Sequence, residues 1–123
     1  MENESYLKRK YFLYSSFSYF SVTNIKEITQ EIIRFRDQRK WKKHHTPKNL
    51  ALSMIIEIGE LFDIFQWLSD DEIYSKLDEE KDHLSDELAD VAIYLFSLAN
   101  ELEVNLEEAI HTKLKKNAKK YPV

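Results

Sequence analysis

Hydrophobic side chains recur every three or four residues over most of this chain, which is the period of an α-helix. The pattern predicts four helices, over residues 25–39, 47–68, 79–102 and 106–119. One glycine and two prolines agree with this, because the many tight turns of a β-rich chain usually draw on those residues. The sequence therefore predicts an all-α fold.

Polar residues that can cap a helix stand where the predicted helices begin. Asn24, Thr46 and Asn105 each precede an apolar periodic stretch, and their side chains can accept a hydrogen bond from the first turn. Ser69 repeats this pattern. We expect it to open one or two turns that break near residues 77–78, before the long third helix.

Short connections between the predicted helices favour a four-helix bundle. The second helix is apolar around most of its circumference, with Leu50, Leu61 and Leu68 on one side and Ile55 and Phe62 on others. Contact with a single neighbour does not need so much apolar surface. We therefore expect oligomerisation to complete the bundle, in a homodimer or a homotetramer.

The length of 123 residues fits one domain. We place it at residues 23–123, after an N-terminal appendage of residues 1–22 that holds seven of the sixteen aromatic side chains. Serines interrupt the apolar run of this appendage, which is too short to span a bilayer. The sequence has no cysteine, which fits a reducing compartment. We expect a cytoplasmic protein that does not use a membrane.

Charge is unevenly distributed along the chain. Residues 57–90 contain thirteen acidic side chains and two lysines, and lysine-rich stretches lie on either side of them. This distribution favours a site that binds cations with its acidic residues and an anionic ligand with its lysines. Helix faces that are simply exposed to solvent would give the same distribution. The formal net charge of −4 gives no reason to expect a nucleic acid polymer as partner.

Four of these acids lie where a hydrophobic core is expected. At 100° per residue, Glu57 points along the apolar stripe of the second helix, and Glu87 does the same on the third. Glu60 and Asp90 follow three residues later, about 60° away around each helix. Two helices thus each direct an acidic pair toward the core.

Something must neutralise these carboxylates, because burying them unpaired is prohibitively costly and four together repel one another. The nearest lysines, Lys76 and Lys81, lie at or beside a connection and offer no salt bridge from a neighbouring turn. Among protonation, water and a metal ion, a hard divalent cation is the best match for oxygen ligands alone. We expect Mg²⁺, with Mn²⁺ as a substitute.

The spacing Glu57-x-x-Glu60 followed by Glu87-x-x-Asp90 resembles the signature of the MazG-like, all-α nucleoside triphosphate pyrophosphohydrolases. The resemblance covers residues 23–123 and is specific, because several linked motifs occur in order. Other stretches are similar to the branch of this family that contains the dCTP pyrophosphatases: residues 41–52, 65–68, 90–95 and 113–122.

The resemblance implies Mg²⁺-dependent hydrolysis of a (deoxy)nucleoside triphosphate between its α and β phosphates, to a monophosphate and pyrophosphate. It implies a role in cleansing the nucleotide pool, with dCTP or a modified deoxynucleotide as substrate. It also implies Glu57, Glu60, Glu87 and Asp90 as metal ligands. Our choice for the catalytic base is Glu60, because a carboxylate not fully committed to metal can accept the proton of the attacking water.

The resemblance implies a nucleotide-binding set as well. Trp41, Trp67 and Tyr94 match positions that line the base and sugar pocket, and flat aromatic faces suit a nucleobase. The polar and basic residues that match are His45, Lys48, Lys113, Asn117, Lys120 and Tyr121. Ile32 departs from the pattern, since close relatives often have a histidine there, and the base preference therefore stays open.

Two other interpretations are weighed against this one. Glu80-x-x-His83 and Glu108-x-x-His111 have the spacing found in di-iron carboxylate bundles, although both lie in the opening turns of their helices. Alternatively, the chain is a non-catalytic all-α interaction module with solvated acids. Release of pyrophosphate from nucleoside triphosphates would distinguish the enzyme from the module.

Overall fold

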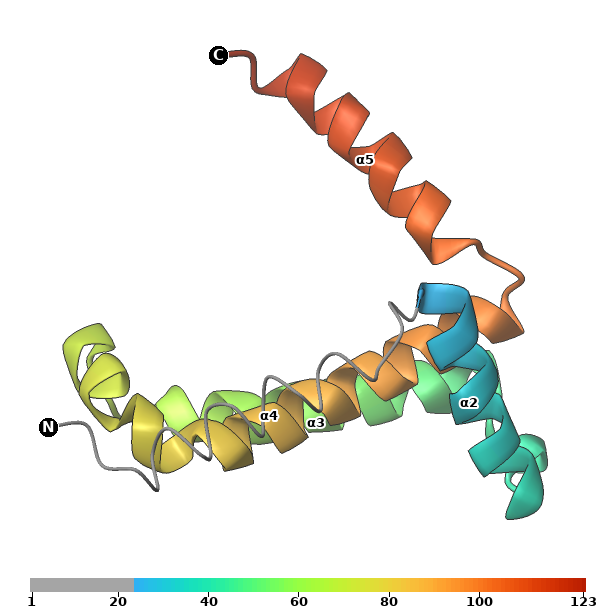
Figure 1. Cartoon of the computed structure of the whole chain (residues 1–123), viewed down its shortest axis with the longest axis horizontal. Coiled ribbons are helices and arrows are strands. Elements are labelled where there is room, and N and C mark those ends of the chain that lie inside the picture. Colours follow the sequence, from blue (N-terminus) through green and yellow to red (C-terminus); the bar gives the residue numbers. More distant parts are fainter. Residues whose placement is uncertain (1–23) are drawn as a thin grey trace, which may run out of the picture.

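The computed structural model describes residues 24–123, and this part of the chain is helical without any strand (Figure 1). The predicted all-α fold with four helices is confirmed there. The predicted appendage of residues 1–22 lies outside the described residues. The elements are α2 (Ile25–Gln38), the 3₁₀ turn η1 (Lys42–His44), α3 (Pro47–Phe65), α4 (Asp70–Glu101) and α5 (Leu106–Lys120).

The helices begin at the capping residues that the sequence indicates. The side chains of Asn24, Thr46 and Asn105 each accept a hydrogen bond from the backbone N–H three residues later, at 2.9, 3.3 and 3.0 Å. Each bond satisfies one of the N–H groups that a helix leaves free in its first turn. Local sequence alone therefore sets these starts.

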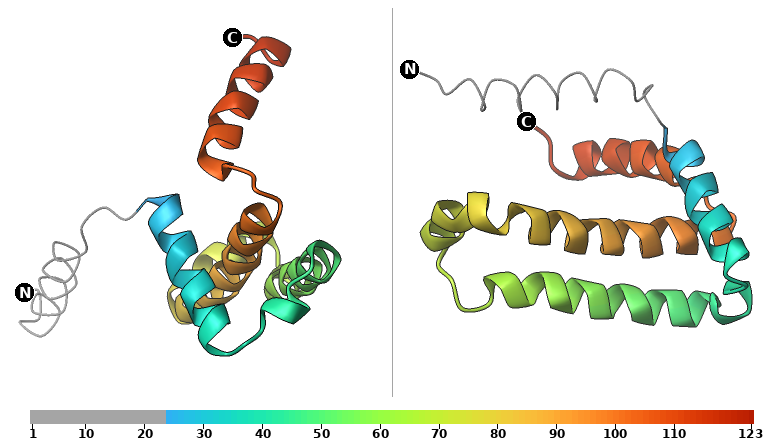
Figure 2. Two further views of the ribbon diagram at one scale, coloured as in Figure 1. Left: turned by 90° about the vertical axis from the view of Figure 1, so that its right-hand side faces the viewer. Right: turned by 60° about the horizontal axis from the view of Figure 1, so that its bottom comes forward.

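The expected break near residues 77–78 is wrong, because α4 runs without interruption from Asp70 to Glu101. Ser69 and Glu72 form a complete capping box at its start, and neither glycine nor proline follows to end the helix. Figure 2 shows instead that the first turns of α4 point in a different direction from the rest of the helix. The second predicted helix also ends early, at Phe65.

Helices α3 and α4 lie side by side as an antiparallel pair. Helix α2 packs against the C-terminal end of α4 (Figure 2). Leu50 of α3 and Leu84 of α4 are the buried apolar residues of the described chain, with 2% and 8% of their surface exposed. Ser97 is also buried and donates a 2.7 Å hydrogen bond to the backbone oxygen of Ile93. The α3–α4 pair is therefore the scaffold of the molecule.

Helix α5 projects away from this scaffold (Figures 1 and 2). Apolar side chains on it stay exposed, with Ile110 at 45% and Leu114 at 59%. Helix α3 likewise has a row of side chains that are 47–66% exposed: Leu52, Ile55, Ile56, Ile58 and Phe62. One copy of the chain thus leaves much apolar helix surface in contact with water.

Among the helices that the structure describes, none combines the length and the apolar character needed to cross a membrane. The cytoplasmic location stays a prediction.

Candidate metal centre

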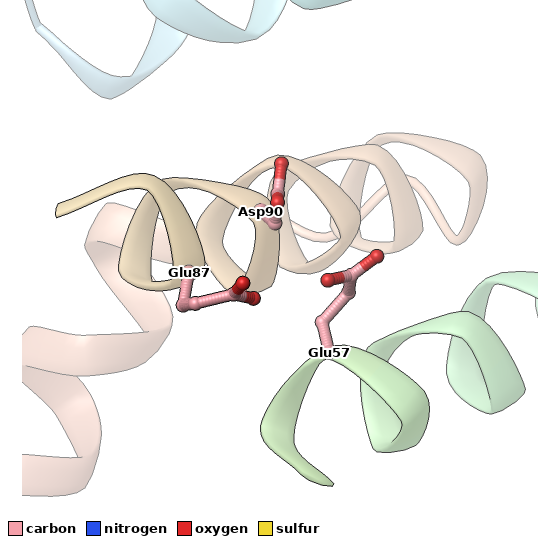
Figure 3. Close-up of side chains that lie close together, drawn as sticks. All are labelled: Glu57, Glu87 and Asp90. Carbon is pink, nitrogen blue, oxygen red and sulfur yellow. The ribbon is translucent and has the colours of Figure 1, made fainter. Parts of the chain in front are cut away.

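Helices α3 and α4 bring three carboxylates together near the middle of their contact (Figure 3). Glu57 reaches across from α3, while Glu87 and Asp90 come from adjacent turns of α4. One oxygen from each of the three lies within 4.8 Å of the other two. The three-residue spacing on α4 places its two acids on the same side of that helix, so both face α3.

The environment of these acids opposes their negative charge. Burial, hydrogen bonding with Glu60 and the charges of Glu60, Asp90 and Glu87 raise the pKa of Glu57 to about 7. The Oε2 atoms of Glu57 and Glu87 are buried and have no hydrogen-bond partner. Buried acceptors without partners are rare and costly.

A divalent cation fits this arrangement. Carboxylate oxygens are the ligands that hard cations prefer, and a cation among the three acids would satisfy both orphaned oxygens and reverse their repulsion. No cysteine or histidine belongs to the group, so the donor set is made of oxygen alone.

Glu60, the fourth predicted ligand, is placed differently. It is exposed and does not belong to the group of three whose oxygens converge. It lies one helical turn after Glu57, close enough to raise the pKa of that residue. The structure therefore brings together three of the four predicted acids and leaves Glu60 beside them.

The sequence interpretation missed a histidine next to the acids. Nε2 of His83 lies 3.5 Å from Oε1 of Glu87, and its Nδ1 lies 3.4 Å from Oε2 of Glu80. From the sequence, His83 is considered only within the Glu80-x-x-His83 spacing. The four-residue spacing to Glu87 was the signal that would have identified it.

Three predicted nucleotide contacts lie at the connection between α2 and α3. Trp41 is half exposed and packs edge-on against Phe35, with ring centroids 5.9 Å apart. Lys48 is exposed in the first turn of α3. His45 has a buried Nδ1 without a partner, and burial, followed by the charge of Arg36, lowers its pKa.

Tyr94 and Trp67 lie on opposite sides of the acids along the scaffold. Tyr94 is half-buried one turn after Asp90, toward the end of α4 that contacts α2. Trp67 follows the end of α3 and is 83% exposed, roughly 15 Å along the axis from Glu57. One chain therefore does not gather both aromatic side chains around a single nucleobase.

The remaining predicted contacts lie at the far end of the chain, where Lys113, Asn117 and Lys120 are spaced along α5 and Tyr121 follows it. Because α5 projects from the scaffold, it does not bring them to the acids of the same chain (Figure 1). The di-iron interpretation fails for the same reason, since Glu108 and its histidine are on α5 as well.

Of the hollows in the surface, one lies beside the acids. This hollow of about 360 Å³ is lined by residues of both scaffold helices: Glu60, Asp63, Ile64, Glu80, His83 and Glu87. Another of about 410 Å³ lies between the start of α2, the end of α4 and the start of α5. The second contains none of the residues that the sequence predicts to be functional.

The sequence of residues 52–123, which includes all four acids, matches the MazG-like family. The dCTP pyrophosphatase 1 of Bos taurus is 36% identical over 109 residues, covering 87% of this chain and 64% of the bovine protein. The dCTP pyrophosphatase 1 of Homo sapiens is 35% identical over 108 residues, with coverages of 86% and 64%. The chain thus spans 64% of the length of these curated relatives.

A solved structure is similar as well. The crystal structure of a pyrophosphatase from Archaeoglobus fulgidus matches with a TM-score of 0.78 and 43% sequence identity. The match covers 85% of this chain and 98% of the archaeal one. The two chains therefore share a fold over most of their length.

Proposed function

Because this chain belongs to the MazG-like family, we propose that it hydrolyses a (deoxy)nucleoside triphosphate between the α and β phosphates, releasing a monophosphate and pyrophosphate. The observation that supports this most directly is the convergence of Glu57, Glu87 and Asp90 with two buried, unpartnered oxygens. The relatives from cattle and humans are named dCTP pyrophosphatase 1, so dCTP and modified deoxynucleotides are the first substrates to test. The proposed role of this hydrolysis is the cleansing of the nucleotide pool.

In this proposal Glu57, Glu87 and Asp90 hold Mg²⁺, or Mn²⁺ in its place, and Glu60 completes the ligand set. When bound, the ion would offset the charge of the triphosphate and orient its α-phosphate for in-line attack. Glu60 also takes the proton of the attacking water. The exposure of Glu60 supports this second role, because its carboxylate is accessible to water and does not belong to the three converging acids.

The substrate nucleotide would lie between the acids and the connection of α2 with α3. Trp41 and Tyr94 provide aromatic surface for the base and sugar, with stacking worth about 1–3 kcal/mol per base. His45 and Lys48 lie close by in the sequence of that connection and supply polar contacts. The buried Nδ1 of His45, which has no partner in this chain, supports its use in binding.

A second copy of the chain would supply the rest of the site. Trp67 and the α5 residues Lys113, Asn117, Lys120 and Tyr121 do not reach the acids of their own chain. The exposed apolar rows of α3 and α5 support a homodimer or homotetramer, because helices rarely leave so much apolar surface in water. In such an oligomer, the lysines of one α5 would neutralise triphosphate bound to another copy.

Pyrophosphate release from a panel of canonical and modified nucleoside triphosphates tests the proposal. We expect turnover with Mg²⁺ and none after chelation. Glu57→Gln and Asp90→Asn should each lower kcat by orders of magnitude, because they weaken the hold on the metal. Glu60→Gln should also lower kcat, but should leave metal affinity closer to that of the wild type.

Glu79→Gln is the matched control, since it makes the same change at an exposed acid of α4 outside the group. It should leave turnover unchanged. A folded wild-type protein that hydrolyses no member of the panel would contradict the proposal and favour a non-catalytic interaction module. Release of single phosphates instead of pyrophosphate would contradict the site of cleavage.

A further inference from the structure

His83 lies at the edge of the acidic group without belonging to it. Its Nε2 is 3.5 Å from Oε1 of Glu87 and its Nδ1 is 3.4 Å from Oε2 of Glu80. The three residues follow one another along one side of α4, at spacings of three and four. The imidazole thus bridges a partly exposed carboxylate and a carboxylate of the candidate metal centre.

The two oxygens of Glu87 have different surroundings. Oε1 faces the imidazole of His83, whereas Oε2 is buried and has no hydrogen-bond partner. The Glu87 side chain is only 14% exposed, while that of His83 is 57% exposed. Oε1 of Glu87 therefore has a neighbouring side chain that can orient it, whereas the buried Oε2 has none.

This division is typical of a metal ligand held by a second residue. A glutamate side chain has three rotatable bonds, and a donor on one oxygen reduces the number of orientations that the other can adopt. In the described chain, no lysine or arginine forms an ion pair with Glu87. Among the described residues, His83 is the side chain whose nitrogen lies within ion-pair distance of Glu87.

We propose that His83 is a positioning residue: supported by Glu80, it orients the carboxylate of Glu87 so that the second oxygen is presented to a divalent cation. This inference rests on the metal centre of the proposed function and adds a residue to it. His83 does not touch the cation. The contact of Nδ1 with Glu80 is at the outer limit of hydrogen-bond length, and the 3.5 Å between Nε2 and Glu87 is an ion-pair distance, so we expect a moderate contribution.

Titration of Mn²⁺ into the metal-free, full-length protein tests this, with binding followed by calorimetry and by electron paramagnetic resonance. His83→Leu keeps a side chain of similar size but removes the donor, and should weaken Mn²⁺ binding about 10-fold. His83→Gln places an amide donor near the position of Nε2, and should recover affinity to within about 3-fold of the wild type.

The chain offers a matched control in His111, which has the same Glu-x-x-His spacing on α5, away from the acids. His111→Leu should bind Mn²⁺ with unchanged affinity. In the activity assay, His83→Leu should raise the Mg²⁺ concentration for half-maximal rate and leave kcat at saturating Mg²⁺ nearly unchanged. A purely structural defect would lower kcat at every metal concentration.

Three results would overturn the assignment of His83. One is equal Mn²⁺ affinity in the wild type and in His83→Leu, and another is a loss that His83→Gln does not recover. The third is nitrogen coupling in the resonance spectrum of the Mn²⁺-loaded wild type, since this would make His83 a direct ligand. A wild type that binds no Mn²⁺ overturns the metal centre itself, and that result is obtained before any variant is compared.

Discussion

The side chain of Glu57 lies in an environment that opposes its own ionisation. Removal from water has the largest effect, and contact with Glu60 and the charges of Glu60, Asp90 and Glu87 add to it, so that the pKa rises to about 7. An ordinary glutamate has a pKa of 4.5. Without metal, this carboxyl therefore lowers the stability of the folded chain most strongly above about pH 7, where it is ionised in both the folded and the unfolded state.

The sign of the resulting pH dependence follows from proton binding. Between pH 4.5 and about 7 the folded chain keeps a proton on Glu57 that the unfolded chain has released. The free energy of unfolding of the metal-free protein should fall as pH rises through this window, and level off above it. Denaturant unfolding at a series of pH values measures this.

Glu57→Gln isolates the contribution of that one carboxyl. The variant should be more stable than the wild type at pH 8 without metal, and the difference should shrink as pH falls toward 4.5, where both side chains are neutral. Saturating Mg²⁺ should reverse the order at pH 8, because the wild type then gains more binding free energy than the variant. A difference that is independent of pH would contradict the raised pKa.

Two helices of the described chain end in the same way, with a residue in the left-handed region where glycine is usual. Lys40 follows α2 with a φ of 58°, and Glu103 follows α4 with a φ of 55°. After α4, the N–H groups of Val104 and Glu103 donate to the carbonyls of Ala99 and Asn100, at 2.8 and 3.1 Å. These bonds are those of a Schellman motif, and they set the direction in which α5 leaves.

Glu103→Gly should stabilise the folded chain by about 0.5–1 kcal/mol, because glycine adopts this conformation without strain. Denaturant unfolding at one fixed protein concentration measures the change. Glu103→Val is the contrasting variant and should destabilise the chain, since a β-branched side chain fits the left-handed region poorly. Equal stability of the two variants would show that this position is not under strain.

The part of the molecule that the structure describes is more open than a closed four-helix bundle. One copy buries few apolar side chains, keeps a row of them exposed on α3, and extends α5 into solvent. Such surfaces usually become buried between subunits. The proposed nucleotide site and the proposed oligomer are therefore linked, because Trp67 and the lysines of α5 do not reach the acids of their own chain and would have to come from another copy.

Ile55→Glu should dissociate the proposed oligomer, because it places a charge in the middle of the exposed apolar row of α3. Light scattering after size-exclusion chromatography measures the mass, and pyrophosphate release should be lost together with the oligomer. Ser75→Glu, an equivalent change at an exposed position of α4 outside that row, should alter neither. An Ile55→Glu protein that keeps the mass and activity of the wild type would contradict the interface on α3.

The sequence by itself determined the helices, their capped starts and the presence of acids on apolar stripes. Capping and periodicity are local, because they depend on residues within one or two turns. Even so, a break near residues 77–78 was predicted from the sequence. The capping box at Ser69 and the absence of glycine and proline after it are local signals that favour the continuous helix α4.

Only the tertiary structure decided which acids converge. The position of α3 along α4 brings Glu57 to Glu87 and Asp90 and leaves Glu60 exposed, and it places His83 at the edge of the group. The direction of α5 was likewise undetermined, since it depends on a two-residue turn at Glu103. The convergence of the acids arises from contacts between residues far apart in the chain, which the helical period of one segment does not encode.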